Sequence, residues 1–392
     1  MLQPNLIWAQ TDAAFAPAAR IDQSSLSGLV DNPVIQSFDL SPDGKTISVL
    51  VTAGSQIGAP LWLVTEDIAA KRVISSRGLG GKANVIANFP PQVLYSNDQR
   101  FLAVQDSAKI RVFDASTLEL LRTISGSSSQ PGLVPLYVLG ASNSDVFVCA
   151  FAPLPQPNYS LHTTPVQLEI VDISSGKQLG EWTSEDVPQS VSPDGDLIAV
   201  SSSQVQRGVF PLNVFDVHGK KVAELTGGFS FRKNVDQAKP LGRVKGQFVG
   251  KQEILLTPDE NTDRTGHPSG DGLQLVNIKE NEVEVRQTVK PQNYGPKGTI
   301  ANSADHRTVL VISWYVSAWD LRHEWALPAS SPDVLVFGRS AKGLSLEATF
   351  PIHGPGLLAD WSPRVSSDGS VIAIAQDGDI TVLAKNLGSR PQ

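Results

Sequence analysis

Short apolar runs alternate with tight polar turns along the whole chain. Ser41-Pro42-Asp43-Gly44 precedes the run Ile47–Val51, and Ser192-Pro193-Asp194-Gly195 precedes Leu197–Val200. Proline and aspartate favour the early positions of a β-turn, and glycine accepts a positive φ, so each such segment reverses the chain before a strand. Related turns recur seven times, centred on residues 43, 98, 143, 194, 250, 305 and 368.

A second strand pattern follows each turn and also occurs seven times. It alternates apolar and polar residues and ends in a polar residue, as in Ile110–Asp114, Leu168–Asp172 and Leu212–Asp216. The turns lie 45 to 63 residues apart, and no helical period is visible between them. This repeat predicts an all-β fold, a seven-bladed β-propeller of four-stranded antiparallel blades. A parallel sheet would need crossover helices.

These turns also carry a family resemblance. The segment Asp172–Lys177 and the Ser-Pro-Asp-Gly turns resemble the WD40-like and YVTN-type repeats of bacterial β-propellers, over nearly the whole chain. The Trp-Asp pair of the eukaryotic WD40 repeat occurs once, at Trp319-Asp320, and does not recur. The resemblance implies the fold and leaves the function open, because such propellers include scaffolds, lactonases, dehydrogenase subunits and peptidase gates.

The blade pattern predicts two different faces. If strands a to d run outward from the axis, the Ser-Pro-Asp-Gly turn joins a to b and the second turn joins c to d. Both then lie on one face, which we call the turn face. The b-to-c and d-to-a connections lie on the opposite, long-loop face, and their lengths vary. Binding residues usually lie in such variable loops on a rigid frame.

The two ends of the chain are predicted to meet. Only eight residues follow Ile380–Ala384, too few for an outermost strand in the last blade. We expect the segment around Ala19 to Leu26 to supply that strand and to close the ring. Residues 19–392 then form a single propeller, and residues 1–18 form a tail resembling the remnant of a secretory signal. This favours a periplasmic or extracellular location over the cytoplasm.

Composition narrows the partners. The chain has 39 acidic and 32 basic residues, a formal net charge of −7, which disfavours nucleic acid because no basic stripe can neutralise phosphates. The sequence contains no apolar run of about 18 residues, so it predicts no membrane span. The single cysteine, Cys149, lies in an apolar strand and is expected to be a buried packing thiol.

Three segments approach known catalytic or ligand motifs and fail. His323-Glu324 begins a zinc-protease motif, but Leu327 stands where the second histidine is required. Asp259–Asp263 has calcium-loop spacing, yet Arg264 replaces the turn glycine. Arg77–Lys82 contains glycines and a lysine, with no helix following, and is expected to be a flexible loop on the long-loop face. The sequence therefore predicts neither a metal site nor a cofactor.

Aromatic and imidazole side chains cluster late in the chain, in the connections assigned to the long-loop face. Such groups are typical of recognition surfaces. The alternative is that the tryptophans simply pack beneath long loops. The predicted binding residues are Trp319, His323, Trp325, His353 and Trp361, with Arg207 and His267 from earlier connections.

Two classes of function remain compatible with these patterns. The first, which we prefer because every catalytic motif fails, is a non-catalytic propeller that binds a protein or peptide through the long-loop face. The alternative is a lactonase-like hydrolase with its site at the mouth of the central channel, where a small molecule could also bind. A hydrolase would need several converging acid–base residues. The candidates for that role are Asp236, Asp263, His267, His353 and Asp360.

Overall fold

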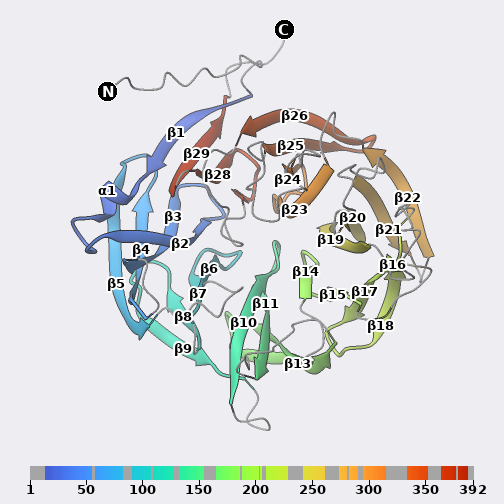
Figure 1. Ribbon diagram of the computed structural model, residues 1–392, viewed down its shortest axis with the longest axis horizontal. Helices are drawn as coiled ribbons and strands as arrows, with labels where there is room; N and C mark the ends of the chain where they lie inside the picture. The colour runs from blue at the N-terminus through green and yellow to red at the C-terminus, as the bar shows by residue number, and fades with distance from the viewer. Residues whose placement is uncertain are drawn as a thin grey trace, which may run out of the picture.

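A computed structural model shows a closed ring of seven antiparallel sheets around a central axis (Figure 1). The structure describes residues 14–54, 58–82, 91–106, 109–126, 132–153, 165–185, 188–202, 204, 209–227, 242–260, 273–279, 282–289, 295–314, 333–351, 363–376 and 378–386. The strand order in each sheet confirms the predicted seven-bladed propeller with four-stranded blades.

The first four blades follow the chain, with the innermost strand given first. Blade 1 is β2 (Pro33–Leu40), β3 (Thr46–Ala53), β4 (Pro60–Asp67) and β5 (Arg72–Lys82). Blade 2 is β6 (Gln92–Tyr95), β7 (Phe101–Gln105), β8 (Ile110–Asp114) and β9 (Leu120–Ile124). Blade 3 is β10 (Leu133–Gly140), β11 (Val146–Pro153), β12 (Val166–Asp172) and β13 (Lys177–Ser184). Blade 4 is β14 (Pro188–Val191), β15 (Leu197–Ser201), β17 (Leu212–Asp216) and β18 (Lys221–Leu225).

The remaining blades complete the ring. Blade 5 is β19 (Gly242–Gly250), β20 (Glu253–Glu260), β21 (Leu273–Lys279) and β22 (Glu282–Val289), with a short extra strand, β16 (Val209–Phe210), parallel to β19. Blade 6 is β23 (Gly295–Asn302), β24 (Thr308–Trp314), β25 (Asp333–Ser340) and β26 (Gly343–Pro351). Blade 7 is β27 (Arg364–Val365), β28 (Val371–Gln376), β29 (Asp379–Lys385) and β1 (Phe15–Ile21).

The N-terminal strand closes the ring by pairing antiparallel with β29, as predicted, but its bounds differ from the prediction. The strand begins at Phe15, and the second half of the segment predicted as strand is a short helix, α1 (Gln23–Leu26). Asp22 ends the strand by capping this helix, because its side chain accepts a hydrogen bond from Ser25 N–H at 2.8 Å. Arg20 also pairs with Asp379 of β29 at 2.5 Å.

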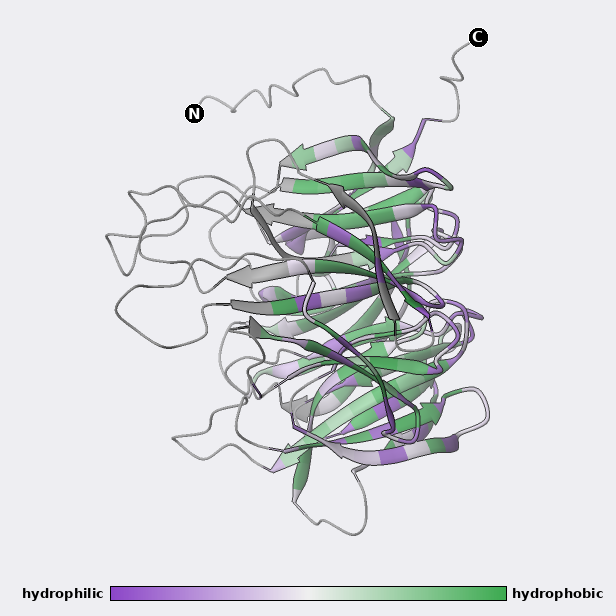
Figure 2. Cartoon of the chain, turned by 90° about the vertical axis from the view of Figure 1, so that its right-hand side faces the viewer, coloured by the Kyte–Doolittle hydropathy of each residue, from purple (hydrophilic) through white to green (hydrophobic). Residues whose placement is uncertain are grey.

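The hydrophobic core lies between neighbouring blades. One cluster, for example, joins Leu50 and Leu63 of blade 1 to Leu102 and Phe113 of blade 2. Each sheet is therefore covered on both faces, which is why the strands are apolar on both sides and flanked by polar turns (Figure 2). Cys149 belongs to such a cluster, and burial raises the pKa of its thiol, as expected of a packing residue.

Five of the inner turns share one hydrogen-bonding scheme, built on a serine and an aspartate two residues later. In the first, Ser41 Oγ donates to Asp43 at 2.8 Å and accepts the Thr46 N–H at 2.9 Å. Burial raises the pKa of Asp43, but hydrogen bonds from Ser41 and Lys45 outweigh it and hold that pKa below its ordinary value. The serines of these turns are Ser41, Ser96, Ser192, Ser303 and Ser366, all buried.

The fourth residue of this turn has a left-handed backbone. It is Gly44, Gly195 or Gly369 in three blades, and Gln99 and His306 in the other two. Glycine also serves a packing role, because a Cβ on Gly195 would lie 2.6 Å from Cβ of Val146 in the preceding blade. Each glycine turn thus fits against the neighbouring blade, which links local turn chemistry to the closure of the ring.

Candidate functional site: the central channel

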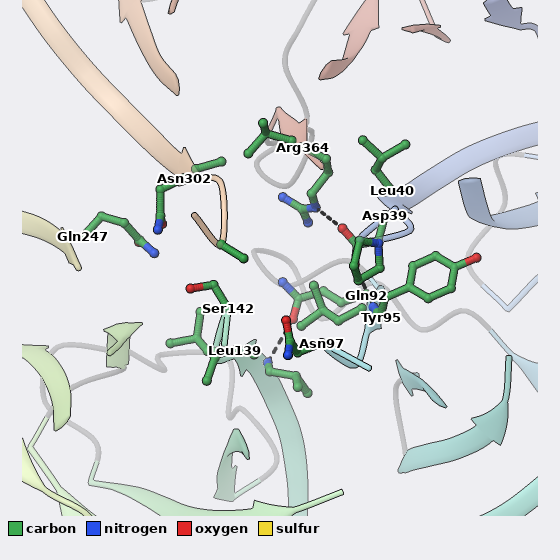
Figure 3. Close-up of a pocket in the computed structure, with 18 of the residues that line it drawn as sticks. Asp39, Leu40, Gln92, Tyr95, Asn97, Leu139, Ser142, Gln247, Asn302 and Arg364 are labelled. Carbon is green, nitrogen blue, oxygen red and sulfur yellow. Dashed lines mark hydrogen bonds and ion pairs between the residues drawn. The ribbon is translucent and has the colours of Figure 1, made fainter. Parts of the chain in front are cut away.

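A cavity of about 480 Å³ lies in the central channel. All seven blades line it through their inner strands and the turns that follow (Figure 3). This volume is in the range of pockets that hold small ligands. The channel is therefore a candidate binding site within the described part of the chain.

Hydrogen bonds between blades organise the channel wall. An innermost strand leaves N–H groups unpaired along its edge, and side chains of the preceding blade accept them. Asp39 accepts from Tyr95 N–H at 2.7 Å, Gln92 from Val138 N–H at 2.9 Å, and Gln189 from Gly246 N–H at 3.0 Å. These polar residues are consequently needed to join blades as well as to line the cavity.

Blades 7 and 1 are joined by an ion pair in the wall. Arg364 Nε lies 2.9 Å from Asp39 Oδ1, and the two side chains are 19% and 13% exposed. Burial raises the pKa of the Asp39 carboxyl, while Arg364 and the Tyr95 N–H oppose the rise. The guanidinium is placed by the beginning of β27 and points into the channel (Figure 3).

Several uncharged polar side chains also point toward the middle of the channel. Gln247 of β19, Asn302 at the end of β23 and Ser142 in the turn after β10 face the same space as Arg364 (Figure 3). Within the described part of the chain, Gln247 and Ser142 make no side-chain hydrogen bond to another residue. Asn302 makes one long contact, from Nδ2 to Ser303 O at 3.4 Å. Donor groups from four blades thus converge.

At the turn face, a hydrogen bond joins two blades that are not neighbours. Asn143 Nδ2 of blade 3 lies 3.1 Å from His306 Nε2 of blade 6. Burial lowers the pKa of His306, although Asp305 and Asp194 oppose the shift, so the neutral ring can accept this N–H. His306 occupies the left-handed turn position that is glycine in three other blades.

The predicted binding residues lie outside the described residues, and so do the hydrolase candidates. The first group is Trp319, His323, Trp325, His353, Trp361, Arg207 and His267, and the second is Asp236, Asp263, His267, His353 and Asp360. The structure does describe Arg77–Lys82, and there the prediction of a loop is wrong. These residues belong to β5, where Arg77 donates to Leu118 O of blade 2 at 2.6 Å.

The described channel residues do not favour the hydrolase alternative. Asp39 is the one carboxylate among them, and it is engaged by Arg364, whereas acid–base hydrolysis needs several converging groups. Across the ranges described above, no three histidine, cysteine or acidic side chains gather as a metal site would require. The same ranges contain no helix with the length and apolarity to cross a bilayer.

Sequence reasoning missed the channel residues because none belongs to a motif. Gln247, Asn302 and Arg364 are single polar residues in short strands, and they meet only after the ring closes. One weak signal was available, since Asp39 and Asn302 each stand within two residues before the serine of a recurring turn. That place in every repeat corresponds to the channel end of an innermost strand.

Comparison with known proteins identifies the fold. No family model matches the chain, and no curated protein does. Among solved structures, the chain resembles hydrazine synthase of Kuenenia stuttgartiensis, with a TM-score of 0.56, 14% identity, and coverage of 92% of this chain and 98% of that one. It also resembles a chain of the mitotic checkpoint complex, with a TM-score of 0.52, 13% identity and coverage of 98% and 96%.

A third similar structure is the β-propeller domain of Cps50 (Swd1) from Myceliophteria thermophila. Its TM-score is 0.52, with 11% identity and coverage of 90% of this chain and 100% of that one. Identities this low are evidence for a shared fold and carry no activity or partner to this chain. With the geometry above, they support a WD40-like β-propeller fold.

Proposed function

We propose that the protein is a non-catalytic propeller that binds a protein or peptide partner through its long-loop face, and that it is related to the WD40-like and YVTN-type bacterial propellers. The neighbours in the mitotic checkpoint complex and Swd1 fit such a role at a coarse level. The partner-binding residues we propose are Trp319, His323, Trp325, His353 and Trp361, with Arg207 and His267 at the margin.

The observation that carries this proposal is the register of blade 6. Ser313 of β24 pairs with Asp333 of β25, and Asp333 pairs with Pro351 of β26, so the three residues form one row across the sheet. This row is the end of the sheet opposite the turn face. The chain segments 315–332 and 352–362, which contain the clustered aromatic residues, are attached to it. The described residues that flank these two segments therefore lie in one row of the sheet, which supports the proposal that the aromatic residues act together.

The turn face is a weaker candidate for partner binding. Its aspartates and serines are occupied within their own turns, as in Ser366 Oγ donating to Asp368 at 2.8 Å. Polar groups with satisfied partners have less to offer a ligand than groups that can form new hydrogen bonds. This contrast supports placing recognition on the long-loop face.

The test compares partner capture with fold stability. A tagged protein is used to capture partners from cells, and the captured protein is identified and titrated in purified form. Trp319→Ala and Trp325→Ala should each weaken its binding by about 2 kcal/mol, roughly thirtyfold, with the melting temperature unchanged. Titrating the purified partner distinguishes specific binding from nonspecific capture out of the cell extract.

The matched control is a tryptophan with a known packing role. Trp182 of β13 packs against Phe215 of β17 in a tilted arrangement, with ring centroids 4.9 Å apart. Trp182→Ala should therefore lower the melting temperature and leave partner affinity intact. If Trp319→Ala and Trp325→Ala behave like this control, the tryptophans pack beneath the loops and the proposal is wrong.

A further inference from the structure

One position between neighbouring blades is apolar in every blade except the first. In each blade the pairing of the third strand with the outermost strand contains a β-bulge at the same place. The third-strand residue just after the bulge packs towards the preceding blade, as Phe113 of blade 2 does beside Leu63 of blade 1. In blade 1 this residue is Glu66, and in the other six blades it is Phe113, Val171, Phe215, Val276, Phe337 and Leu383.

This exceptional glutamate is buried without a polar partner. Glu66 is 5% exposed, and its Oε1 atom makes no hydrogen bond to a described residue. Its cross-strand neighbours are Ile47 of β3 and Val73 of β5, which are both apolar. An ionised carboxylate in such surroundings is costly, and its protonated form is much less so. Glu66 therefore resists ionisation for as long as this part of the ring stays closed.

The side of β4 that carries Glu66 faces the segment that closes the ring. Side chains alternate along a strand, so Glu66 projects to the same side as Val64. Val64 belongs to one core cluster with Ile21 of β1 and Leu26 of α1, which lie beside blade 1 (Figure 1). The closing segment, which we define as Phe15–Leu26, therefore packs on blade 1 at the contact where Glu66 lies.

The elements next to Glu66 carry charged groups, but none of them forms an ion pair with it within the described chain. They are Asp22 at the start of α1, Arg20 of β1 with its partner Asp379 of β29, Lys45 before β3, and Asp67, Lys71 and Arg72 at the β4–β5 turn. Burial raises the pKa of Glu66, and the Asp22 carboxylate raises it further. Hydrogen bonds from Ser24 and Ser25 hold the pKa of Asp22 below its ordinary value, so this neighbour stays charged.

We propose that Glu66 makes closure of the ring sensitive to pH: the closing segment packs on blade 1 while Glu66 is protonated, and ionisation of Glu66 weakens this packing. The folded-state pKa of Glu66 lies above its unfolded value. Its contribution to stability is therefore fully present below the unfolded pKa and is lost as the pH rises through the folded-state pKa. The proposal concerns the junction of blades 7 and 1 and does not depend on the proposed partner-binding face.

The experiment is hydrogen exchange of the full chain, read by mass spectrometry for β1 and, as an internal reference, for β7 of blade 2. Because β1 is the edge strand of its sheet, it can open while the rest of the ring stays folded. The protection factor is the intrinsic exchange rate divided by the observed rate. From pH 5 to pH 8 it should fall by at least about tenfold in β1 and by less than about threefold in β7. An equal fall in both strands, or no fall in β1, would overturn the proposal.

Variants assign the pH dependence to Glu66. Glu66→Gln keeps the shape of the side chain without its charge, and Glu66→Val introduces the residue type that blades 3 and 5 have at this position. In both, the protection factor of β1 should change by less than about threefold over the same pH range. Glu119→Gln, the same neutralisation at an exposed carboxylate in blade 2, is the matched control and should keep the wild-type response. Melting curves at pH 5 confirm that each variant is folded. If Glu66→Gln and Glu66→Val both keep the full wild-type response, another group causes it and the proposal is wrong.

Discussion

The turn face and the channel wall are both rich in polar residues, but they satisfy their hydrogen bonds in opposite ways. In the turns, the partners are close in sequence, as when Asp368 accepts from Ser366 and Ser370. In the channel, the partners lie in different blades, as when Gln189 accepts from Gly246 N–H. The serine–aspartate pairs of the turns therefore stabilise local structure, and a smaller number of turn-face contacts, such as Asn143–His306 and Asp194–Lys251, join different blades. In the channel, contacts between blades predominate, and Gln247 and Ser142 have no side-chain partner among the described residues.

The turns and the channel wall also differ in when their contacts can form as the ring assembles. Turn formation needs only a short loop to close, so its conformational entropy cost is small. The channel contacts form only when distant strands have assembled, because Arg364 and Asp39 are far apart in the chain. The turns can therefore form locally, whereas the contacts of the channel wall form only when the whole propeller has closed.

The largest expected effect comes from breaking the ion pair in the channel wall. Arg364→Gln leaves the Asp39 carboxylate buried without its counter-charge, and we expect a loss of about 3–5 kcal/mol in the free energy of unfolding at pH 7. The paired change D39N with R364Q leaves no orphan charge and should cost less than about 2 kcal/mol. Urea unfolding measures both. If both variants lost the same free energy of unfolding, leaving the Asp39 carboxylate without its counter-charge would have no extra cost, as at an exposed surface.

A second comparison separates turn strain from packing between blades. Gly195 and Gly54 both have φ near the left-handed region, at 84° and 87°, but a Cβ on Gly54 would meet no atom within 4 Å. Gly54→Ala should therefore cost about 1 kcal/mol in strain alone. Gly195→Ala adds a close contact with Val146 and should cost about 2–4 kcal/mol. Similar melting shifts in the two variants would mean that the turns are not fitted to the neighbouring blade.

The sequence predicted the turn face well because its causes are local. Ser41, Asp43 and Gly44 specify a turn within a few residues, and the same arrangement recurs in blades whose glycine is replaced, as at Gln99. The positive φ predicted for Gly44 and Gly195 is confirmed. Alternation in the following strands then sets which residues enter the core between blades.

The channel and the exact closing strand could not be predicted in the same way. β1 is defined by pairing Phe15 with Lys385 and Ile21 with Ile380, a register set by the opposite end of the chain. Gln247, Asn302 and Arg364 become a cluster only because seven innermost strands meet at one axis. No local sequence pattern predicts which residues come together at this axis. The number of repeats predicts a seven-bladed ring, but it does not identify the side chains that line its channel.

The smallest expected effect sharpens the opening comparison through pH. Burial raises the pKa of Asp368, but hydrogen bonds from Ser370 and Ser366 outweigh it and hold that pKa below the ordinary value of 3.8. The ionised form therefore stabilises the native state above that pH, and the contribution disappears as the pH falls through the lower, folded-state pKa. Asp368→Asn should cost about 1 kcal/mol at pH 7, a modest figure because the carboxylate is largely exposed, and nearly nothing once the wild-type group is protonated.

Ser142→Ala, in the channel, should change stability by less than about 0.5 kcal/mol at either pH, because it removes no hydrogen bond within the described chain. Urea unfolding across this pH range checks both variants. A pH-independent loss in Asp368→Asn, or a loss in Ser142→Ala as large as that of the turn variant, would contradict the division between a self-satisfied turn face and a channel wall open to ligand.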